Sequence, residues 1–74
     1  MATYMIGDLM TLTGLSRHTI NYYLNVGLIE PAGQSPRNRY RYFDDDTVDR
    51  LRRIIRLRQQ KIPIRKIKRQ LAEE

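Results

Sequence analysis

The fold is decided by residues 13–27, which read TGLSRHTINYYLNVG. Gly14 can end one helix in a left-handed conformation that costs glycine little, and Ser16 is a good N-cap for the next helix. Gly27 can end that second helix in the same way. The stretch therefore predicts a helix that begins after Ser16 and runs to about Val26, with a short turn before it.

The two sides of this predicted helix differ in polarity. Ile20, Tyr23 and Leu24 share one side at helical spacing, so this side is expected to pack inward. The other side carries side chains that can donate hydrogen bonds, namely Arg17, His18, Asn21 and Tyr22. The helix is therefore expected to be anchored by one face and to present the other to a partner.

A shorter helix is predicted directly before the turn, over about residues 6–13. Spacings of three and four put one set of residues on the same side of it, namely Ile6, Leu9, Met10 and Thr13. Two short helices joined by a turn that contains Gly14 match the helix-turn-helix plan, here over about residues 6–26.

A small hairpin is predicted after the second helix. Leu28 and Ile29 lead into residues 30–36, a turn-rich run with two prolines that cannot form a continuous helix. Residues 39–43 lead out as an aromatic, alternating strand, but neither of its faces is cleanly apolar. We therefore expect a partly exposed wing over about residues 29–43 rather than a core strand.

A second helix pair is predicted over about residues 45–71. Asp44 is a suitable N-cap for a helix to about Gln60, whose apolar stripe consists of Val48, Leu51, Ile54 and Ile55. Pro63 can start the last helix, which runs to about Leu71. The fold class expected is mainly α: a single winged helix-turn-helix domain over residues 1–74, with four helices and a small β-hairpin wing between helices 2 and 3.

The charge is distributed unevenly along the chain. The net charge is +6, and Arg17 is the only one of the 14 Lys and Arg residues that precedes position 37. This balance favours an anionic partner, with nucleic acid before a membrane surface. The arginines of the wing, Arg37, Arg39 and Arg41, alternate with Tyr40 and Tyr42, an arrangement suited to phosphate contacts beside a groove that the helix occupies.

Other functions are disfavoured by the composition. The chain has no cysteine and one histidine, so a disulfide framework or a structural zinc site is not expected. Asp44, Asp45 and Asp46 favour helix capping over a metal site, and Ser16 has no partner base for catalysis. We expect no cofactor, no metal and no enzymatic activity. With no apolar run of membrane length and no signal-peptide pattern, we expect a cytoplasmic, nucleoid-associated protein.

The order of motifs resembles the DNA-binding domain of the mercury-resistance-regulator (MerR) family across nearly the whole chain. The first part of the match is Tyr4, Ile6, Gly7, Asp8, Leu9, Thr13, Gly14, Leu15, Ser16, Thr19, Ile20, Tyr22, Tyr23, Gly27, Leu28, Ile29 and Pro31. The second part is Asn38, Tyr40, Arg41, Tyr42, Phe43, Val48, Arg50, Leu51, Ile54, Leu57, Arg58, Ile62, Pro63, Ile64 and Ile67.

The resemblance implies a bacterial regulator whose relatives bind two-fold-symmetric promoter sites as dimers. Many of those relatives distort an overlong promoter spacer so that RNA polymerase can engage both promoter elements. Carried over by position, the implied DNA contacts are Tyr22, Tyr23, Tyr40, Arg41 and Arg58. Tyr23 is also expected to point inward, with its ring packed and its hydroxyl on a phosphate.

The sequence departs from the family pattern at four positions. Asn21 stands where the family usually has arginine, and Leu24 stands where it usually has an acid. Arg39 and Lys61 each replace a glycine, in the wing and at a helix end. The change at position 21 weakens one expected DNA contact and is expected to alter base preference.

Oligomeric state and overall role stay open on the sequence. The chain ends where the family's dimerisation helix and effector domain would begin, so it reads as a piece of a longer protein or as a naturally short one. We expect a homodimer in a full-length parent, but a monomer or weak dimer for this chain because it shows no coiled-coil seam. Two other hypotheses remain: a phage-type excision or architectural DNA-binding protein, and a basic RNA- or protein-interaction module built on residues 50–69.

Overall fold

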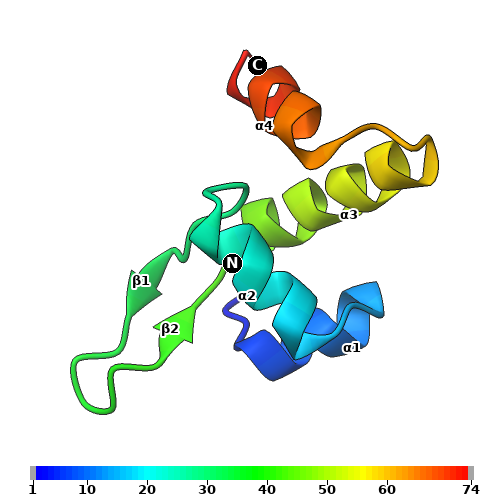
Figure 1. Ribbon diagram of the computed structural model, residues 1–74. Helices are drawn as coiled ribbons and strands as arrows, with labels where there is room; N and C mark the ends of the chain where they lie inside the picture. Colours follow the sequence, from blue (N-terminus) through cyan, green and yellow to red (C-terminus); the bar gives the residue numbers. More distant parts are fainter. Residues whose placement is uncertain (1, 74) are drawn as a thin grey trace.

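The computed structural model describes residues 2–73. Four helices and one hairpin follow one another along the chain (Figure 1): α1 (Ile6–Thr13), α2 (Arg17–Asn25), β1 (Gly33–Gln34), β2 (Arg41–Tyr42), α3 (Asp45–Gln59) and α4 (Ile64–Ala72). The mainly helical fold with a hairpin between the second and third helices is thus confirmed.

The helix ends lie where the capping residues predict them. The Ser16 hydroxyl accepts a hydrogen bond from the Thr19 amide at 3.1 Å, which fixes the first turn of α2. Asp44 caps α3 in the same way, accepting from the Thr47 amide at 3.3 Å. Gly14 follows α1 with φ 76°, a left-handed conformation that a side chain would strain.

The hairpin begins later than the sequence predicts. β1 lies inside the turn-rich run, where Gly33 pairs with Tyr42 and Gln34 with Arg41. Leu28 and Ile29 do not belong to the wing, because they are buried in the core with 0% and 2% of their surface exposed. Burial of these two apolar side chains outweighs their strand propensity, so the wing consists of residues 33–42 rather than 29–43.

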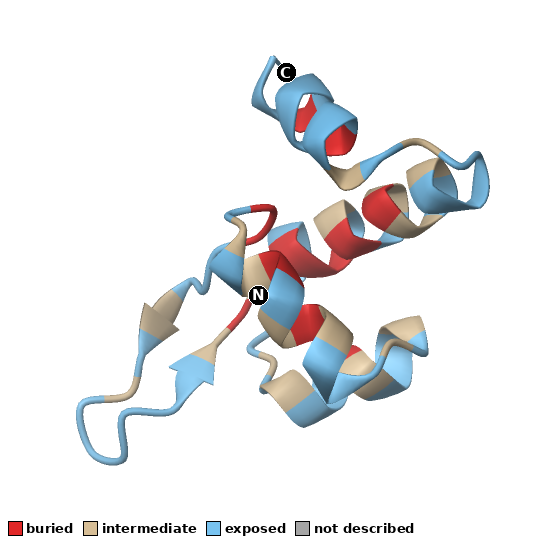
Figure 2. Cartoon of the chain, in the orientation of Figure 1, coloured by how far each residue is buried: buried red, intermediate tan, exposed pale blue. Residues whose placement is uncertain are grey.

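One continuous hydrophobic core joins the helices (Figure 2), and α3 packs against both α1 and α4. The buried apolar residues are Leu9, Ile20, Tyr23, Leu28, Ile29, Phe43, Val48, Leu51, Ile54, Ile67 and Leu71. Those in the helices lie on apolar faces at helical spacing, whereas Leu28, Ile29 and Phe43 are contributed by the segments on either side of the wing. Ile55 and Ile64 are only partly buried. The helices are therefore held mainly by tertiary burial, as expected for helices this short.

The base of the wing is attached to the N-terminus. Tyr4 and Phe43 form an isolated antiparallel bridge, with N–H···O distances of 2.8 and 2.7 Å. The Tyr4 hydroxyl donates to the Asp45 carboxylate at 2.7 Å, and this hydrogen bond raises the pKa of Tyr4. These contacts fix the direction in which the hairpin leaves the helical part of the molecule.

Candidate nucleic-acid interface

The two sides of α2 face as the sequence predicts. Arg17 and His18 are exposed in its first turn, and Tyr22 is 45% exposed. Tyr23 points inward and is 6% exposed, with its ring centroid 6.0 Å from that of Tyr22. Asn21 is partly buried. The helix is therefore anchored by its apolar side and presents polar side chains on the other.

Tyr23 lies near enough to Arg58, in the last turn of α3, for that charge to act on its hydroxyl. Burial raises the pKa of its hydroxyl, and the charge of Arg58 acts on the same hydroxyl in the opposite direction. Arg58 itself is exposed, and its Nη1 donates to the Ile62 carbonyl at 2.9 Å. Arg58 therefore holds the turn between α3 and α4, whatever further contacts its guanidinium makes.

The wing carries its arginines in an irregular turn between β1 and β2. Arg37 and Arg39 are exposed there, Arg41 is exposed on β2, and Tyr40 is 64% exposed. The backbone of the turn is held by side chains: the Gln34 amide donates to the Arg39 carbonyl at 2.7 Å. In the part of the chain that the structure describes, the three arginine side chains make no hydrogen bond or ion pair, so their charges are available to a partner.

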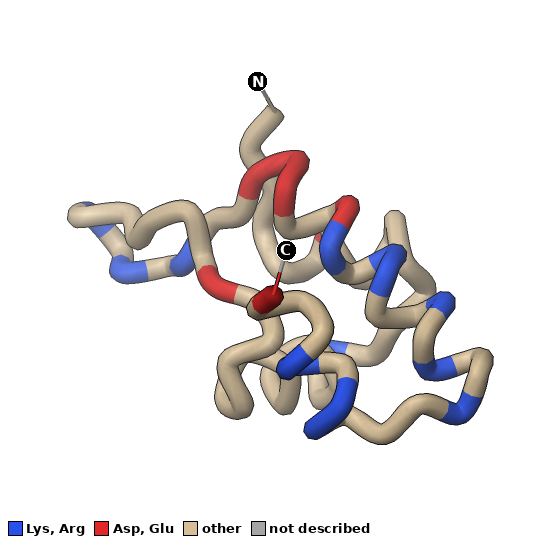
Figure 3. Tube along the Cα trace, turned by 90° about the horizontal axis from the view of Figure 1, so that it is seen from above, with Lys and Arg blue, Asp and Glu red and all other residues tan. Residues whose placement is uncertain are grey.

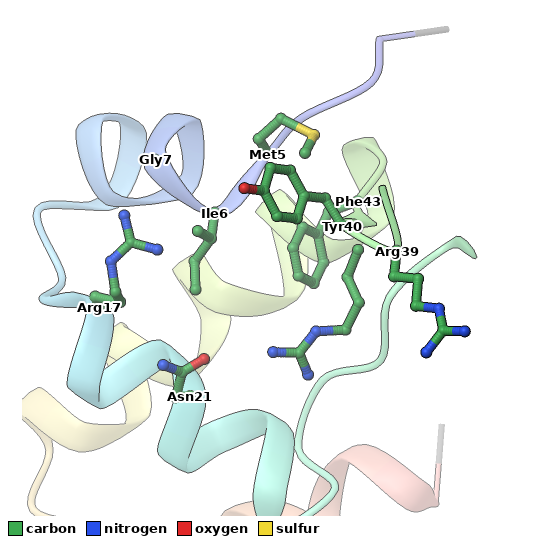
Figure 4. Close-up of a pocket in the computed structure, with 9 residues that line it drawn as sticks. Met5, Ile6, Gly7, Arg17, Asn21, Arg39, Tyr40 and Phe43 are labelled. Carbon is green, nitrogen blue, oxygen red and sulfur yellow. The ribbon is translucent and has the colours of Figure 1, made fainter. Parts of the chain in front are cut away.

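An open groove brings the wing and α2 together (Figure 4). Its lining consists of Met5, Ile6, Gly7, Arg17, Asn21, Arg39, Tyr40, Arg41 and Phe43. Two of the predicted residues come from α2 and three from the wing, which is about 20 positions further along the chain. The other predicted residues, His18, Tyr22, Tyr23, Arg37 and Arg58, do not line this groove.

Four lining residues were not predicted as part of the site: Phe43 directly after β2, and three residues at the start of α1. Met5, Ile6 and Gly7 form the groove wall at the start of α1. Helical spacing marks Ile6 only as a core residue, and nothing in the sequence indicates that this helix end would face the wing. The juxtaposition follows from the Tyr4–Phe43 bridge, which pairs residues 39 positions apart.

Four of the acidic residues gather at the start of α3. Asp44, Asp45 and Asp46 stand at the beginning of α3, with Asp49 one turn on. Figure 3 shows these acids as one cluster, while the Lys and Arg positions occupy the wing and the remainder of α3 and α4. Acids at the start of a helix are favoured by its dipole. Among the residues that the structure describes, three arginines and no carboxylate line the groove, which makes it attractive to anions.

Within residues 2–73, no group of His, Cys, Asp and Glu is placed to hold a metal ion. None of the helices described is both long and apolar enough to span a bilayer.

Comparison with known proteins adds to this geometry. The family model described as "MerR HTH family regulatory protein" matches residues 4–74. The HTH-type transcriptional regulator CueR of Bacillus subtilis (strain 168) is 35% identical over 72 residues, which cover 97% of this chain and 49% of CueR.

Two solved structures extend the likeness to three dimensions. A MerR-family transcriptional regulator from Bacillus cereus matches with a TM-score of 0.89 at 14% identity, covering 96% of this chain and 52% of that one, which shows the shared fold. HiNmlR, a MerR-family regulator lacking the sensor domain and bound to promoter DNA, matches with a TM-score of 0.82 at 25% identity, covering 92% of this chain and 51% of its own. The chain spans about half the length of these three relatives.

Proposed function

The chain belongs to the MerR family of helix-turn-helix regulatory proteins, and from this premise we propose that it binds promoter DNA as a sequence-specific duplex reader. The observation that carries the proposal is the groove in which Arg17 and Asn21 of α2 lie with Arg39, Tyr40 and Arg41 of the wing. A helix fits the major groove of DNA, and an arginine-bearing ribbon beside it suits the flanking phosphates.

The proposed DNA contacts are of two kinds, those to base edges and those to phosphates. Side chains from the first turns of α2, Arg17, His18 and Asn21, face the base edges. Arg37, Arg39 and Arg41 on the wing contact phosphates, and the exposed side chains of Tyr22 and Tyr40 add to these contacts. Tyr23 and Arg58 make further DNA contacts near the C-terminal end of α2. The buried ring of Tyr23 positions its hydroxyl for such a contact. The relatives are transcriptional regulators, and the proposal includes neither a catalytic step nor a cofactor.

The setting of this activity is also part of the proposal. HiNmlR is bound to promoter DNA in its crystal structure, and we propose a promoter or operator as the ligand here, in the cytoplasm at the nucleoid. A regulator of this kind would act on RNA polymerase indirectly, by distorting the promoter DNA that the polymerase binds. We further propose that residues 1–74 alone are monomeric or weakly dimeric on DNA, and that a longer parent is a homodimer.

The test is selection of bound sequences from random duplex DNA at several salt concentrations. Recovery of a two-fold-symmetric site supports a promoter regulator, whereas repeated half-sites at one spacing indicate an architectural protein, and preference for single strands indicates RNA binding. If 6 to 10 phosphates are contacted, affinity should fall roughly 10³- to 10⁵-fold between 50 and 200 mM salt. Salt-independent or absent duplex binding would contradict the proposal.

Arg41→Ala tests the wing directly. This variant should weaken binding to every duplex and lower the slope of log affinity against log salt by about one. The matched control is Arg52→Ala, which removes the same charge from an exposed position on α3 outside the groove. Electrophoretic mobility shifts over a salt series measure both. Equal losses of DNA affinity in the two variants would show that binding depends only on the total charge. That result would contradict the proposed contact between Arg41 and a phosphate.

A further inference from the structure

We propose that Asn21 selects an adenine in each half-site, reading it through a pair of hydrogen bonds from its side-chain amide in the major groove. This inference rests on the proposed function and names a base that the site recognises.

The position of Asn21 is the first step. Asn21 lies four residues after Arg17, so the two side chains stand one above the other on successive turns of α2. Both line the groove shared with the wing, and in Figure 4 both leave α2 on the side where Ile6 and Tyr40 lie. An anion-attracting wing beside this row would hold the duplex so that the row faces its base edges.

The second step is that the Asn21 amide has no hydrogen-bond partner in the part of the chain that the structure describes. Among residues 2–73 its side chain makes no hydrogen bond, although Ser16 and Thr19 in the first turn of the same helix are bonded to each other at 2.9 Å. Asparagine is also a weaker helix former than arginine or alanine. The helix therefore gains nothing locally from this residue, while two donors and an acceptor remain available to a ligand.

The third step is the match of donors and acceptors. Adenine presents N7 as an acceptor beside the N6 amino donor in the major groove, and an asparagine amide can satisfy both at once. Guanine presents two acceptors, so one of the amide's two bonds would be lost and its oxygen would face O6 or N7. An arginine at this position would have the opposite preference, because its fork of donors suits guanine.

The first experiment is sequence selection with matched variants. The parent chain should fix one adenine per half-site, and changing that A·T pair to G·C should weaken binding roughly 5- to 100-fold. Asn21→Ala should lose this preference, and Asn21→Arg should favour guanine at the same position. The control is Asn25→Ala, the same truncation one turn further along α2 at a residue that does not line the groove; it should leave the preference unchanged.

The second experiment tests whether the Asn21 side chain contacts N7 of the selected adenine. Substitution of 7-deazaadenine for the selected adenine removes the N7 acceptor and keeps the pairing with thymine. It should weaken binding of the parent chain several-fold but leave binding of Asn21→Ala unchanged, so the two losses are not additive. Circular dichroism and thermal melting of each variant verify that α2 is intact; alanine, a stronger helix former than asparagine, should not lower the melting temperature.

The outcomes separate this inference from the proposed function. Salt-dependent duplex binding with the same adenine preference in the parent and in Asn21→Ala, or with additive effects of 7-deazaadenine, would overturn the role of Asn21 alone. Loss of duplex binding by the parent chain itself would overturn both.

Discussion

At the scale of single residues, two side chains adopt a backbone conformation that their chemistry disfavours. Arg39 and Lys61 have φ of 62° and 64°, in the left-handed region where a Cβ crowds the following carbonyl. Glycine would adopt this conformation at both positions without that crowding. Both side chains are exposed and, among residues 2–73, neither makes a hydrogen bond that would offset the strain. Arg39 lines the groove, where its positive charge can attract DNA phosphates despite the backbone strain.

Lys61→Gly should make the fold more stable. The reference is Lys61→Ala, which removes the same charge but keeps a Cβ, so the difference between the two variants isolates the backbone strain. We expect the glycine variant to be more stable than the alanine variant by about 1 kcal/mol. For a domain of this size that corresponds to a melting temperature higher by roughly 4–8 °C. Urea unfolding followed by circular dichroism gives the free energies, and an alanine variant as stable as the glycine one would show that the strain is absent.

At the scale of secondary-structure elements, the wing is the least self-sufficient part of the fold. Each of its strands has two residues, and an isolated two-stranded hairpin is marginal in water. Within the wing, Gly33 lies directly opposite Tyr42, and the Tyr42 ring lies so close over Gly33 that an added methyl group would overlap its hydroxyl. At its base, the Tyr4–Phe43 bridge ties the hairpin to the start of α1. An aromatic ring covering a cross-strand glycine pins the register of such a short pair.

Gly33→Ala should loosen the wing without unfolding the domain. The new Cβ displaces the end of the Tyr42 ring, so we expect faster hydrogen exchange at the amides of Ala32 and Ser35, which donate to the Tyr42 and Tyr40 carbonyls. Global stability should change by less than about 1 kcal/mol, because β1 and β2 contribute little to the core. Gly7→Ala is the control, since a Cβ there meets nothing within 4 Å. Unchanged exchange in the Gly33 variant would mean that the ring moves aside at no cost to the hairpin.

At the scale of the whole molecule, the charges are separated into regions. The acids at the start of α3 form one cluster, and most of the positive charge lies on the wing, the remainder of α3 and α4 (Figure 3). A net charge of +6 on 74 residues opposes compaction through self-repulsion. The same excess draws the molecule towards nucleic acid, so its stability alone and its affinity for DNA depend on salt in opposite directions.

Raising the salt concentration from 20 to 200 mM should therefore stabilise the free protein. Screening shortens the range of repulsion between exposed Lys and Arg side chains, and we expect a gain of less than about 1 kcal/mol, because each exposed pair contributes little. Thermal melting at several sodium chloride concentrations measures this, with sodium sulfate at equal ionic strength as a check on ion-specific effects. A melting temperature that falls with salt would show that attraction between the acidic and basic regions outweighs the net repulsion.

Local features of the sequence predicted the helices well. Ser16 and Asp44 cap α2 and α3, Gly14 follows α1 in the left-handed conformation, and the inward side of α2 carries Tyr23. Each of these signals acts within one or two helical turns, so it can be read without knowing what the helix packs against. The predicted start of the wing was wrong. The burial of Leu28 and Ile29 depends on the core and not on their neighbours in the sequence.

The sequence alone determined the helix boundaries, the side of α2 that faces outward and the family to which the motifs point. Only the tertiary structure decided that Arg17 and Asn21 would face Arg41 across one groove, with the start of α1 as its wall. The reason is that the wing's direction is set by backbone pairing between Tyr4 and Phe43, a contact between distant positions that leaves no periodic trace in the chain. Local preferences fix elements, whereas long-range pairing and burial fix how those elements meet.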